Sequence, residues 1–309
     1  MRIAFLTTEF ITEPDSYDGG LSNYIYKVSI GLLKFGHQPI VIIPSNENSY
    51  FKYKDIEVYR VKPQQNFLYK LADKVSRYKY QPILDLLLQS YCVNKKLNQI
   101  NKEKAIDIVQ FPSYQAIGYF VSNKIKSIMR ISSYQKLADP ANGLYYKTIR
   151  QRQWQILENR SYKKAKHIFG PSYFLANIIS KEFNKPVKVI ESPNEKKEIE
   201  SDTTIIEEIE RKTNGRKFGL YFGRLAQIKG LLEITEILDA FLTKHPSHYF
   251  VIIGKDVGYK GSSSLDYLLK KAGKHQDRLI YYKEQHHEKL MAVIQKADFI
   301  LMPSRIENF

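Results

Sequence analysis

The chain has 309 residues, of which 43% are hydrophobic, enough to build about two packed domains of ordinary size. Its formal net charge of +16 favours anionic partners, such as phosphate-bearing substrates, nucleic acid or an acidic membrane surface. The single cysteine, Cys92, excludes an internal disulfide framework and a metal site built of cysteines.

The sequence also disfavours a secreted, a membrane-spanning and a sequence-specific nucleic-acid-binding protein. Met1-Arg2 leads directly into an apolar strand, without a signal peptide, and no apolar run is long enough to cross a membrane. Lysines and arginines are spread along the whole chain, with no RNP, zinc-finger or helix-turn-helix pattern. We therefore predict a cytoplasmic protein with no specific nucleic-acid partner.

The first half of the chain alternates short apolar runs with segments whose apolar residues recur at helical spacing. Strands are predicted at residues 3–6, 39–43, 56–61, 106–111, 127–131, 167–170 and 187–190, and helices at 21–35, 83–100, 141–166 and from 173 onward. Strands separated by helices predict a parallel, doubly wound α/β sheet.

A glycine pair, Gly19-Gly20, ends the loop after the first strand and opens the first helix. Glycines let the backbone come close to a ligand, and a helix N-terminus attracts anions. The pair follows the carboxyl end of a strand, where open α/β sheets bind ligands. These features favour a binding loop, although a flexible loop tip would have the same composition.

Residues 50–81 interleave aromatic and basic side chains around the strand at 56–61. Such a mixture suits the interface of an anionic bilayer, where each nearby cation contributes about 1 kcal/mol. It predicts peripheral contact with the inner face of a membrane. A solvated helix with buried tyrosine rings accounts for the stretch equally well.

The two halves are separated by residues 191–216, which contain no long apolar run and are predicted to be a linker. The first domain is then 1–190 and the second 217–309. Strands in the second domain are predicted at 218–222, 249–253, 279–282 and 299–302, with helices at 231–243, 264–272 and 288–296. The alternation again indicates a doubly wound α/β domain.

The stretch KFGLYFGRLAQIKG, residues 217–230, predicts a strand, a turn at Gly223 and a basic loop carrying Arg224 and Lys229 before a helix. The helix N-terminus and the two cations suit a diphosphate, and hydrogen bonds to charged groups are worth ~1.5–3 kcal/mol each. Gly254 follows the next strand on the same edge. A solvated loop on an ordinary α/β domain is the alternative.

Two such domains leave a cleft between them, and each presents a glycine-bearing loop to it. Gly19-Gly20 would face the cleft from the first domain, and Gly223, Arg224 and Lys229 from the second. We expect one diphosphate to bridge both loops.

Four segments along the chain carry a family resemblance. In sequence they resemble the glycine-pair helix, a serine-led helix, the diphosphate loop and the acidic signature of family 4 glycosyltransferases, which have two Rossmann-like domains in the GT-B architecture. The matching segments are GGLSNYIYKVSIGLLKFGHQPIVI, GPSYFLANII, YFGRLAQIKGLLEITEIL and ADFILMPSRIENF.

The resemblance implies roles for individual residues. Gly20 would donate its backbone N–H to the distal phosphate, and Arg224 and Lys229 would neutralise the diphosphate leaving group. Glu307 would contact hydroxyls of the donor sugar, and Lys283-Glu284 lie in a loop that selects the base. The family retains anomeric configuration, usually without a divalent metal, so no cofactor is expected. The resemblance implies a nucleotide-sugar donor, for which we predict a UDP-hexose, and a saccharide or lipid-linked acceptor. The aromatic and basic stretch at 50–81 suggests that the product is a surface polysaccharide.

Two departures from the family pattern stand out. The signature's second glutamate would fall beyond Phe309, so the chain looks truncated and its second domain incomplete. The family's acceptor-side histidine is also missing, because Ser132 or Ser133 occupies its place after the strand at 127–131. His286-His287 is not expected to bind metal, since neighbouring residues at a strand end point apart.

Two other functions remain open from the sequence. A sugar-nucleotide epimerase of the same fold would turn over its substrate without an acceptor. A basic, non-catalytic protein would bind nucleic acid or anionic lipid with steep salt dependence and would not bind nucleotide sugars.

Overall fold

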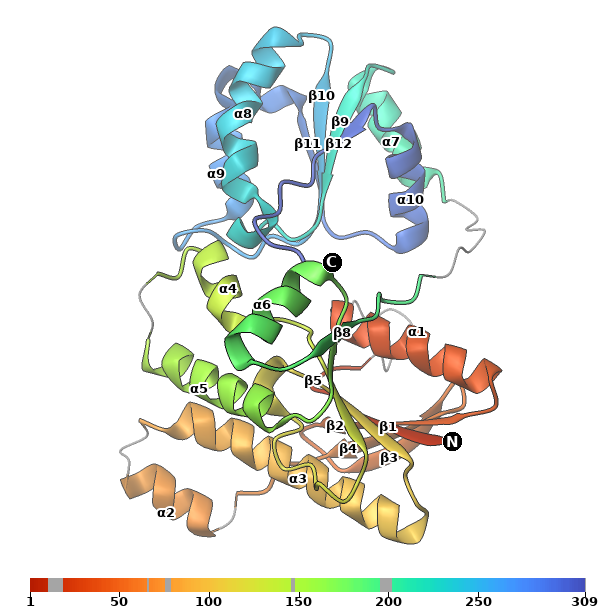
Figure 1. The fold of residues 1–309 in the computed structure, drawn as a ribbon. Coiled ribbons are helices and arrows are strands. Elements are labelled where there is room, and N and C mark those ends of the chain that lie inside the picture. Colours follow the sequence, from red (N-terminus) through yellow and green to blue (C-terminus); the bar gives the residue numbers. More distant parts are fainter. Residues whose placement is uncertain (11–18, 66, 76–78, 146–147, 195–201, 309) are drawn as a thin grey trace. The chain divides into compact units, whose positions relative to one another are not determined.

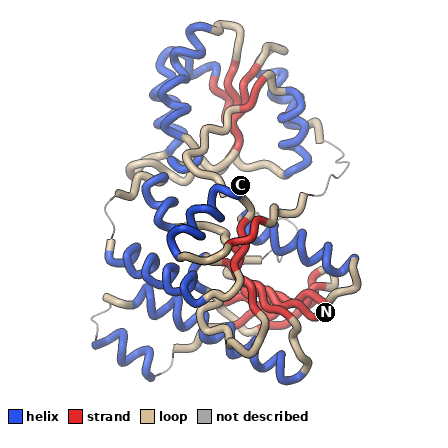
Figure 2. The backbone as a smooth tube through the Cα atoms, in the orientation of Figure 1, coloured by secondary structure: helices blue, strands red, loops and turns tan. Residues whose placement is uncertain are grey.

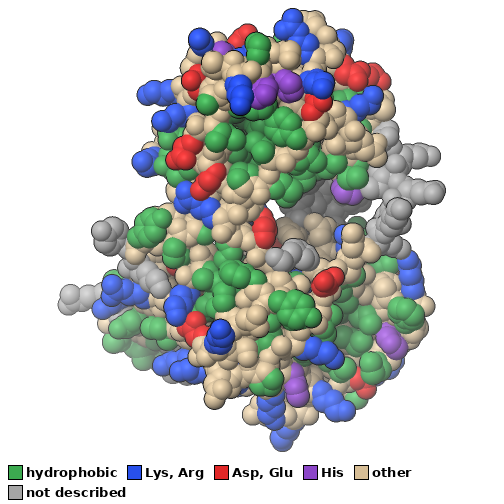
Figure 3. Space-filling model, turned by 45° about the horizontal axis from the view of Figure 1, so that its top comes forward, with side chains coloured by type: hydrophobic (Ala, Val, Ile, Leu, Met, Phe, Trp, Pro, Cys, Tyr) green, Lys and Arg blue, Asp and Glu red, His purple; other side chains and the backbone are tan. Residues whose placement is uncertain are grey.

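A computed structural model shows two compact α/β units (Figures 1 and 2). The first contains residues 1–136, 146–194 and 308–309, and the second 137–145 and 195–307. Lys and Arg side chains are spread over the surface of both units in the view of Figure 3. The structure describes residues 1–10, 19–65, 67–75, 79–145, 148–194 and 202–308.

The first unit is built on an eight-stranded sheet in the order β3-β4-β2-β1-β5-β6-β7-β8. All neighbouring strands are parallel except β3, which is antiparallel to β4 and was not predicted. The strands are β1 (Arg2–Leu6), β2 (Gln38–Pro44), β3 (Ser49–Tyr53), β4 (Ile56–Val61), β5 (Ile108–Pro112), β6 (Ser127–Arg130), β7 (Ile168–Gly170) and β8 (Val187–Val189).

Helices flank this sheet, some packed on its strands and others on a neighbouring helix. They are α1 (Gly20–Lys34), α2 (Phe67–Val75), α3 (Gln81–Glu103), α4 (Gln135–Ala141), α5 (Ile149–Lys164) and α6 (Tyr173–Phe183). The single helix predicted at 141–166 is instead α5, because Thr148 and Gln151 form a reciprocal capping box that starts it at Ile149.

The second unit has a four-stranded parallel sheet in the order β11-β10-β9-β12. Helices α8 and α9 cover one face, and α7 and α10 cover the other (Figure 1). The elements are α7 (Thr204–Thr213), β9 (Phe218–Phe222), α8 (Leu231–Lys244), β10 (Tyr249–Ile253), α9 (Ser264–Ala272), β11 (Leu279–Tyr282), α10 (His287–Lys296) and β12 (Phe299–Ile300).

The predicted linker at 191–216 is shorter in the structure. Helix α7 places Ile205, Ile206 and Ile209 in the core of the second unit, beside Phe218 and Val251. Burial of these three side chains fixes α7 to the second sheet, so the second unit begins before residue 217. Residues 195–201 of the expected linker lie outside the described part of the chain.

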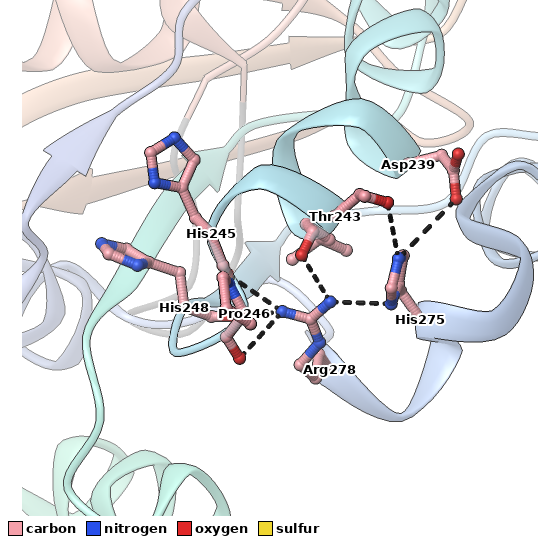
Figure 4. A network of polar contacts seen from close by, with 8 residues as sticks. Asp239, Thr243, His245, Pro246, His248, His275 and Arg278 are labelled. Carbon is pink, nitrogen blue, oxygen red and sulfur yellow. Dashed lines mark hydrogen bonds and ion pairs between the residues drawn. The ribbon is translucent and has the colours of Figure 1, made fainter.

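A buried arginine closes the carboxyl end of α8 (Figure 4). Arg278 is 9% exposed and also contacts a ring nitrogen of His275 at 2.7 Å. Its guanidinium donates to four backbone carbonyls, those of Leu242, His245, Pro246 and His248. The cation meets the negative end of the helix dipole and anchors α8, whose other end carries the loop described next.

Candidate functional site

The loop between β9 and α8 is tied to the neighbouring strand of the second unit. The N–H of Gly223 donates to Ile253 at 2.9 Å, and the N–H of Leu225 donates to Lys255 at 2.9 Å. The loop therefore runs along the carboxyl ends of β9 and β10, which is where parallel sheets bind ligands. The predicted strand, turn and helix are confirmed.

Glycine is required in this loop because the backbones approach each other closely. A Cβ on Gly254 would lie 1.8 Å from the carbonyl oxygen of Gly223. Gly230 has φ +84°, and a Cβ there would lie 2.3 Å from the carbonyl oxygen of Pro303. Gly254 thus has a packing reason for its identity, and Gly223 has a backbone reason, its φ of +134°. Their contact with a ligand stays a prediction.

Tyr221 fixes the backbone at both predicted cations, a role that the sequence reasoning missed. Its hydroxyl donates to the carbonyl of Arg224 at 2.8 Å and to that of Lys229 at 3.4 Å. The ring is 2% exposed, and burial raises the pKa of Tyr221 to about 12, so the hydroxyl stays a neutral donor. The structure therefore brings the backbones of Arg224 and Lys229 together around one buried hydroxyl.

The side chains of the two cations have different surroundings. Arg224 is exposed. The Nζ of Lys229 lies 2.5 Å from the Oε1 of Glu307, the residue predicted to contact the donor sugar. Burial would raise the pKa of the Glu307 carboxyl, but hydrogen bonds from Lys229 and Ser304 outweigh it, so this pKa lies below its ordinary value. The Glu307 carboxyl is therefore ionised at neutral pH.

At the start of α8 the N–H groups of Gly230 and Leu231 donate to loop carbonyls, those of Gln227 at 3.0 Å and Ala226 at 3.3 Å. Gly230 caps the helix without a side-chain hydrogen bond, so its backbone N–H groups are not covered by the cap residue. The acid of this turn, Glu233, is neutralised by Arg305, whose Nε lies 2.6 Å from Oε1. Arg305 also donates its backbone N–H to Ile228 at 2.9 Å, which holds the segment before Glu307 against the loop.

Lys283 and Glu284 follow β11 on the same edge of this sheet, because β10 and β11 are parallel. Both side chains are exposed. Their assignment to the base of a nucleotide stays a prediction.

In the first unit, Gly19 caps α1 and Gly20 is its first residue. A Cβ on Gly19 would lie 3.2 Å from both carboxylate oxygens of Glu9, whereas a Cβ on Gly20 would meet nothing within 4 Å. A carboxylate therefore lies beside the amino end of α1. The expected sharing of one diphosphate by Gly20, Arg224 and Lys229 stays a prediction.

Ser132 and Ser133 occupy the place where the family has an acceptor-side histidine, and hydrogen bonds to Ser113 hold their backbone in the first unit. The hydroxyl of Ser113, after β5, donates to the carbonyl of Ser133 at 2.9 Å and accepts from the N–H of Ser132 at 3.2 Å. These serines join the carboxyl ends of β5 and β6. Their geometry supplies no acid or base.

Two features are absent from the described residues. No group of three or more His, Cys, Asp or Glu side chains there is arranged to hold a metal ion. No helix in the same ranges is both long and apolar enough to cross a membrane.

Solved structures show the fold. The chain is similar to sucrose-phosphate synthase from Thermosynechococcus elongatus, with a TM-score of 0.71 and 13% identity, covering 100% of this chain and 76% of that one. HepE from Anabaena, solved in complex with UDP, gives a TM-score of 0.64 at 13% identity, covering 100% of this chain and 75% of that one. The predicted fold, two Rossmann-like units of the GT-B class, is confirmed.

The family is shown by the sequence itself. Residues 18–193 match Glycosyltransferase Family 4, and residues 202–309 match Glycosyl transferases group 1. The first match covers more than half of the chain, which therefore belongs to Glycosyltransferase Family 4.

Two curated relatives match a shorter segment. A GDP-mannose:cellobiosyl-diphosphopolyprenol alpha-mannosyltransferase from Xanthomonas campestris is 33% identical over 90 residues, which is 29% of this chain and 23% of that protein. The enzyme of the same description from Xanthomonas oryzae is 34% identical over 97 residues, 31% of this chain and 25% of that protein. Each match spans about a quarter of the relative's length.

Proposed function

We propose that this glycosyltransferase moves a hexose from a nucleoside diphosphate to a saccharide or lipid-linked acceptor in the synthesis of a surface polysaccharide. The observation that supports it best is the loop after β9, where Tyr221 holds Arg224 and Lys229 at the start of α8. Positive charge fixed in advance stabilises the negative charge that develops on a departing diphosphate.

The ion pair between Lys229 and Glu307 supports the assignment of the sugar end. When the diphosphate takes up Lys229, the Glu307 carboxylate loses its cation and becomes free to accept hydrogen bonds from sugar hydroxyls. Arg224 and Lys229 supply the two charges that a metal would otherwise provide, so we propose that no divalent cation takes part. Retention of configuration is part of the same proposal, carried by family membership.

The base of the donor nucleotide is inferred only from the ligands and donors named for similar proteins. UDP was expected from the resemblance and is the ligand in the HepE structure, whereas the curated relatives are named for GDP-mannose. We propose UDP as the donor nucleotide and include GDP in every titration.

Nucleotide affinity tests the proposal. Isothermal titration of the protein with UDP and GDP, with and without EDTA, should show binding that the chelator does not change. Arg224→Ala should lower the affinity for the nucleotide about 10- to 100-fold, because a charge-assisted hydrogen bond is worth ~1.5–3 kcal/mol. Arg216→Ala, an exposed arginine before β9, is the matched control and should bind as the wild type does.

Either of two results would overturn the proposal: absence of binding to both nucleotides, or equal affinities for the two arginine variants. Hexose transfer is then distinguished from epimerisation by turnover of the nucleotide sugar only when an acceptor is added.

A further inference from the structure

A hollow of about 670 Å³ lies in the first unit, outside the loop that carries the proposed function. Residues 48–50, 59–62 and 64–65, around the hairpin of β3 and β4, form one wall, and residues of α3 between Tyr91 and Gln99 form the other. Part of the aromatic and basic stretch at 50–81, which the sequence left open between a membrane surface and a solvated helix, therefore lines a concave site.

The hollow exists because a helix covers only part of the sheet. Helix α3 packs on β2 and β4 with Val93, Leu97 and Ile100 buried beneath it, whereas β3 is the last strand of the sheet. Tyr91, Lys95 and Gln99 recur at four-residue spacing and stand along the exposed flank of α3.

Two further hollows adjoin this site. One of about 220 Å³ shares Lys62 and Gln65 with it, and another of about 450 Å³ lies across the exposed ridge of Tyr91, Lys95 and Gln99, on the other flank of α3. We call the three together the α3 trough. Its walls run along the helix from residue 85 to residue 102, about 25 Å at the rise of an α-helix. Ser45, just after the carboxyl end of β2, lines one end, so the trough opens at the edge where open α/β sheets bind ligands.

The α3 trough is strongly basic. Lys62, Lys95, Lys96 and Lys102 line it, and none of the four forms an ion pair within the described ranges of the chain. The carboxylate in its walls, Asp85, accepts a hydrogen bond from Tyr69 at 2.5 Å. Uncompensated cations lining a concave surface focus a positive field on a ligand that enters it.

Aromatic rings and amides alternate with these cations. Tyr50 and Tyr59 lie with ring centroids 4.8 Å apart, the Nζ of Lys96 lies 5.0 Å from the Tyr59 ring centroid, and Tyr91 is 50% exposed. In the first hollow four side-chain amides, each both donor and acceptor, complete the walls: Asn48, Gln64, Gln65 and Gln99. Ring faces suit the C–H faces of sugars, and amides suit hydroxyls. The hollow shape fits a chain molecule better than it fits a flat bilayer.

We propose that the α3 trough binds an acidic oligosaccharide, a chain of sugars that carries carboxylates, several units at a time. Its role as the track of the acceptor rests on the proposed function, but the binding itself does not. The lysines would pair with carboxylates at intervals along the chain, while the tyrosines and amides would contact the sugar rings between them.

The test uses fluorescently labelled uronic-acid oligosaccharides of galacturonate, of mannuronate and of alternating glucuronate, titrated into the full chain. The methyl ester of each is the uncharged partner with the same backbone. We expect the wild type to bind at least one acid form at least tenfold more tightly than its ester. Failure to bind any of the three acids would overturn the proposal.

A matched pair of double variants locates the binding. Lys95→Gln/Lys96→Gln removes two cations from α3, and Lys270→Gln/Lys271→Gln removes two from α9. The second lysine of each pair lies over a tyrosine ring, at 5.0 Å from Tyr59 and 5.9 Å from Tyr267. The α3 variant should lose at least threefold in affinity for the acid, and the α9 variant should stay within twofold of the wild type. Equal losses would overturn the proposal.

A third variant distinguishes a saccharide from other anions. Tyr91→Ala keeps every charge and removes an exposed ring, so affinity for the acidic oligosaccharide should fall severalfold while binding of short polyphosphate should not. If polyphosphate, oligo-dT or phosphatidylglycerol vesicles bind more tightly than the saccharides, and Tyr91→Ala changes nothing, the trough is a general anion or membrane surface and the proposal fails.

Nucleotide titration separates this inference from the proposed function. Lys95→Gln/Lys96→Gln should bind UDP as the wild type does. Should the wild type bind uronic-acid chains but no nucleotide, the proposed function fails while the saccharide site stands.

Discussion

The β9–α8 loop and the α3 trough present positive charge in different ways. In the loop two cations lie within six residues on a backbone held by Tyr221, and one of them is paired with Glu307. In the trough four lysines are distributed along α3 and the β3–β4 hairpin without ion pairs in the described residues. Concentrated charge on a fixed backbone suits one small diphosphate, whereas distributed charge between rings and amides suits a long chain. The consequences of substitution should differ accordingly.

The largest effect is expected where the loop backbone is closest to its neighbour. Gly254→Ala would put a Cβ 1.8 Å from a backbone oxygen, and the forced shift should destabilise the second unit by roughly 3 kcal/mol and abolish UDP binding. Binding of acidic oligosaccharide to the first unit should persist. Thermal melting and the two titrations measure this.

Gly31→Ala is the control for that change. Gly31 lies inside α1 with open space at its Cβ position, so alanine there should leave the protein as stable or up to ~1 kcal/mol more stable. A Gly254→Ala protein that melts with the wild type and still binds UDP would show that the close approach does not constrain the loop.

The next largest effect is expected at Asp256, whose lowered pKa makes the stability of the second unit depend on pH. Asp256 accepts hydrogen bonds from the backbone N–H groups of Gly258, Ser264 and Leu265 and from the Ser263 hydroxyl at the start of α9. Burial alone would raise its pKa, but these hydrogen bonds lower the pKa of Asp256 from 3.8 to about 2. A carboxyl whose pKa is lowered by folding stabilises the folded state at every pH above its pKa in the unfolded chain. This contribution of ~2 kcal/mol is lost as the pH falls toward 2.

Asp256→Asn should therefore be less stable than the wild type by about 2 kcal/mol at pH 7, and the difference should shrink between pH 4 and pH 2. Urea denaturation at several pH values measures the gap, with Asp277→Asn, an exposed position in the same unit, as the control. Because Leu225 pairs with Asp256, UDP binding should weaken together with this stability as the pH falls. A gap that does not change with pH would contradict the assignment of Asp256.

Local sequence was sufficient to predict much of the second unit. The observed bounds of β9, β10 and β11 coincide with the apolar runs at 218–222, 249–253 and 279–282. Gly223, Arg224 and Lys229 could be placed together because one strand, one turn and one helix contain them all. Glu307 is 78 residues from its partner Lys229, and only the family resemblance indicated it.

The remaining features depend on contacts between distant segments or on unusual backbone. The β3–β4 hairpin turns at Lys54 and Asp55, which have φ of 46° and 66° without a glycine to indicate the turn. Helix α7 has the acidic composition of a linker, and only packing against the second sheet reveals it as a core element. The α3 trough joins two segments some thirty residues apart, so no local pattern predicts its shape.

The smallest effect should come from a single lysine of the trough. Lys102 lines the hollow farthest from the carboxyl edge of the sheet, and Lys102→Gln removes one of several similar cations. Because each exposed pair with a carboxylate contributes ~0.2–1 kcal/mol, the affinity for a uronic-acid chain should fall less than about fivefold. The loss should vanish for oligosaccharides too short to reach that end, which a series of increasing length would show. An affinity loss above tenfold that is the same for short and long oligosaccharides would mean that Lys102 dominates binding in the trough. The positive charge would then be concentrated there as it is in the diphosphate loop, and the contrast between the two regions would no longer hold.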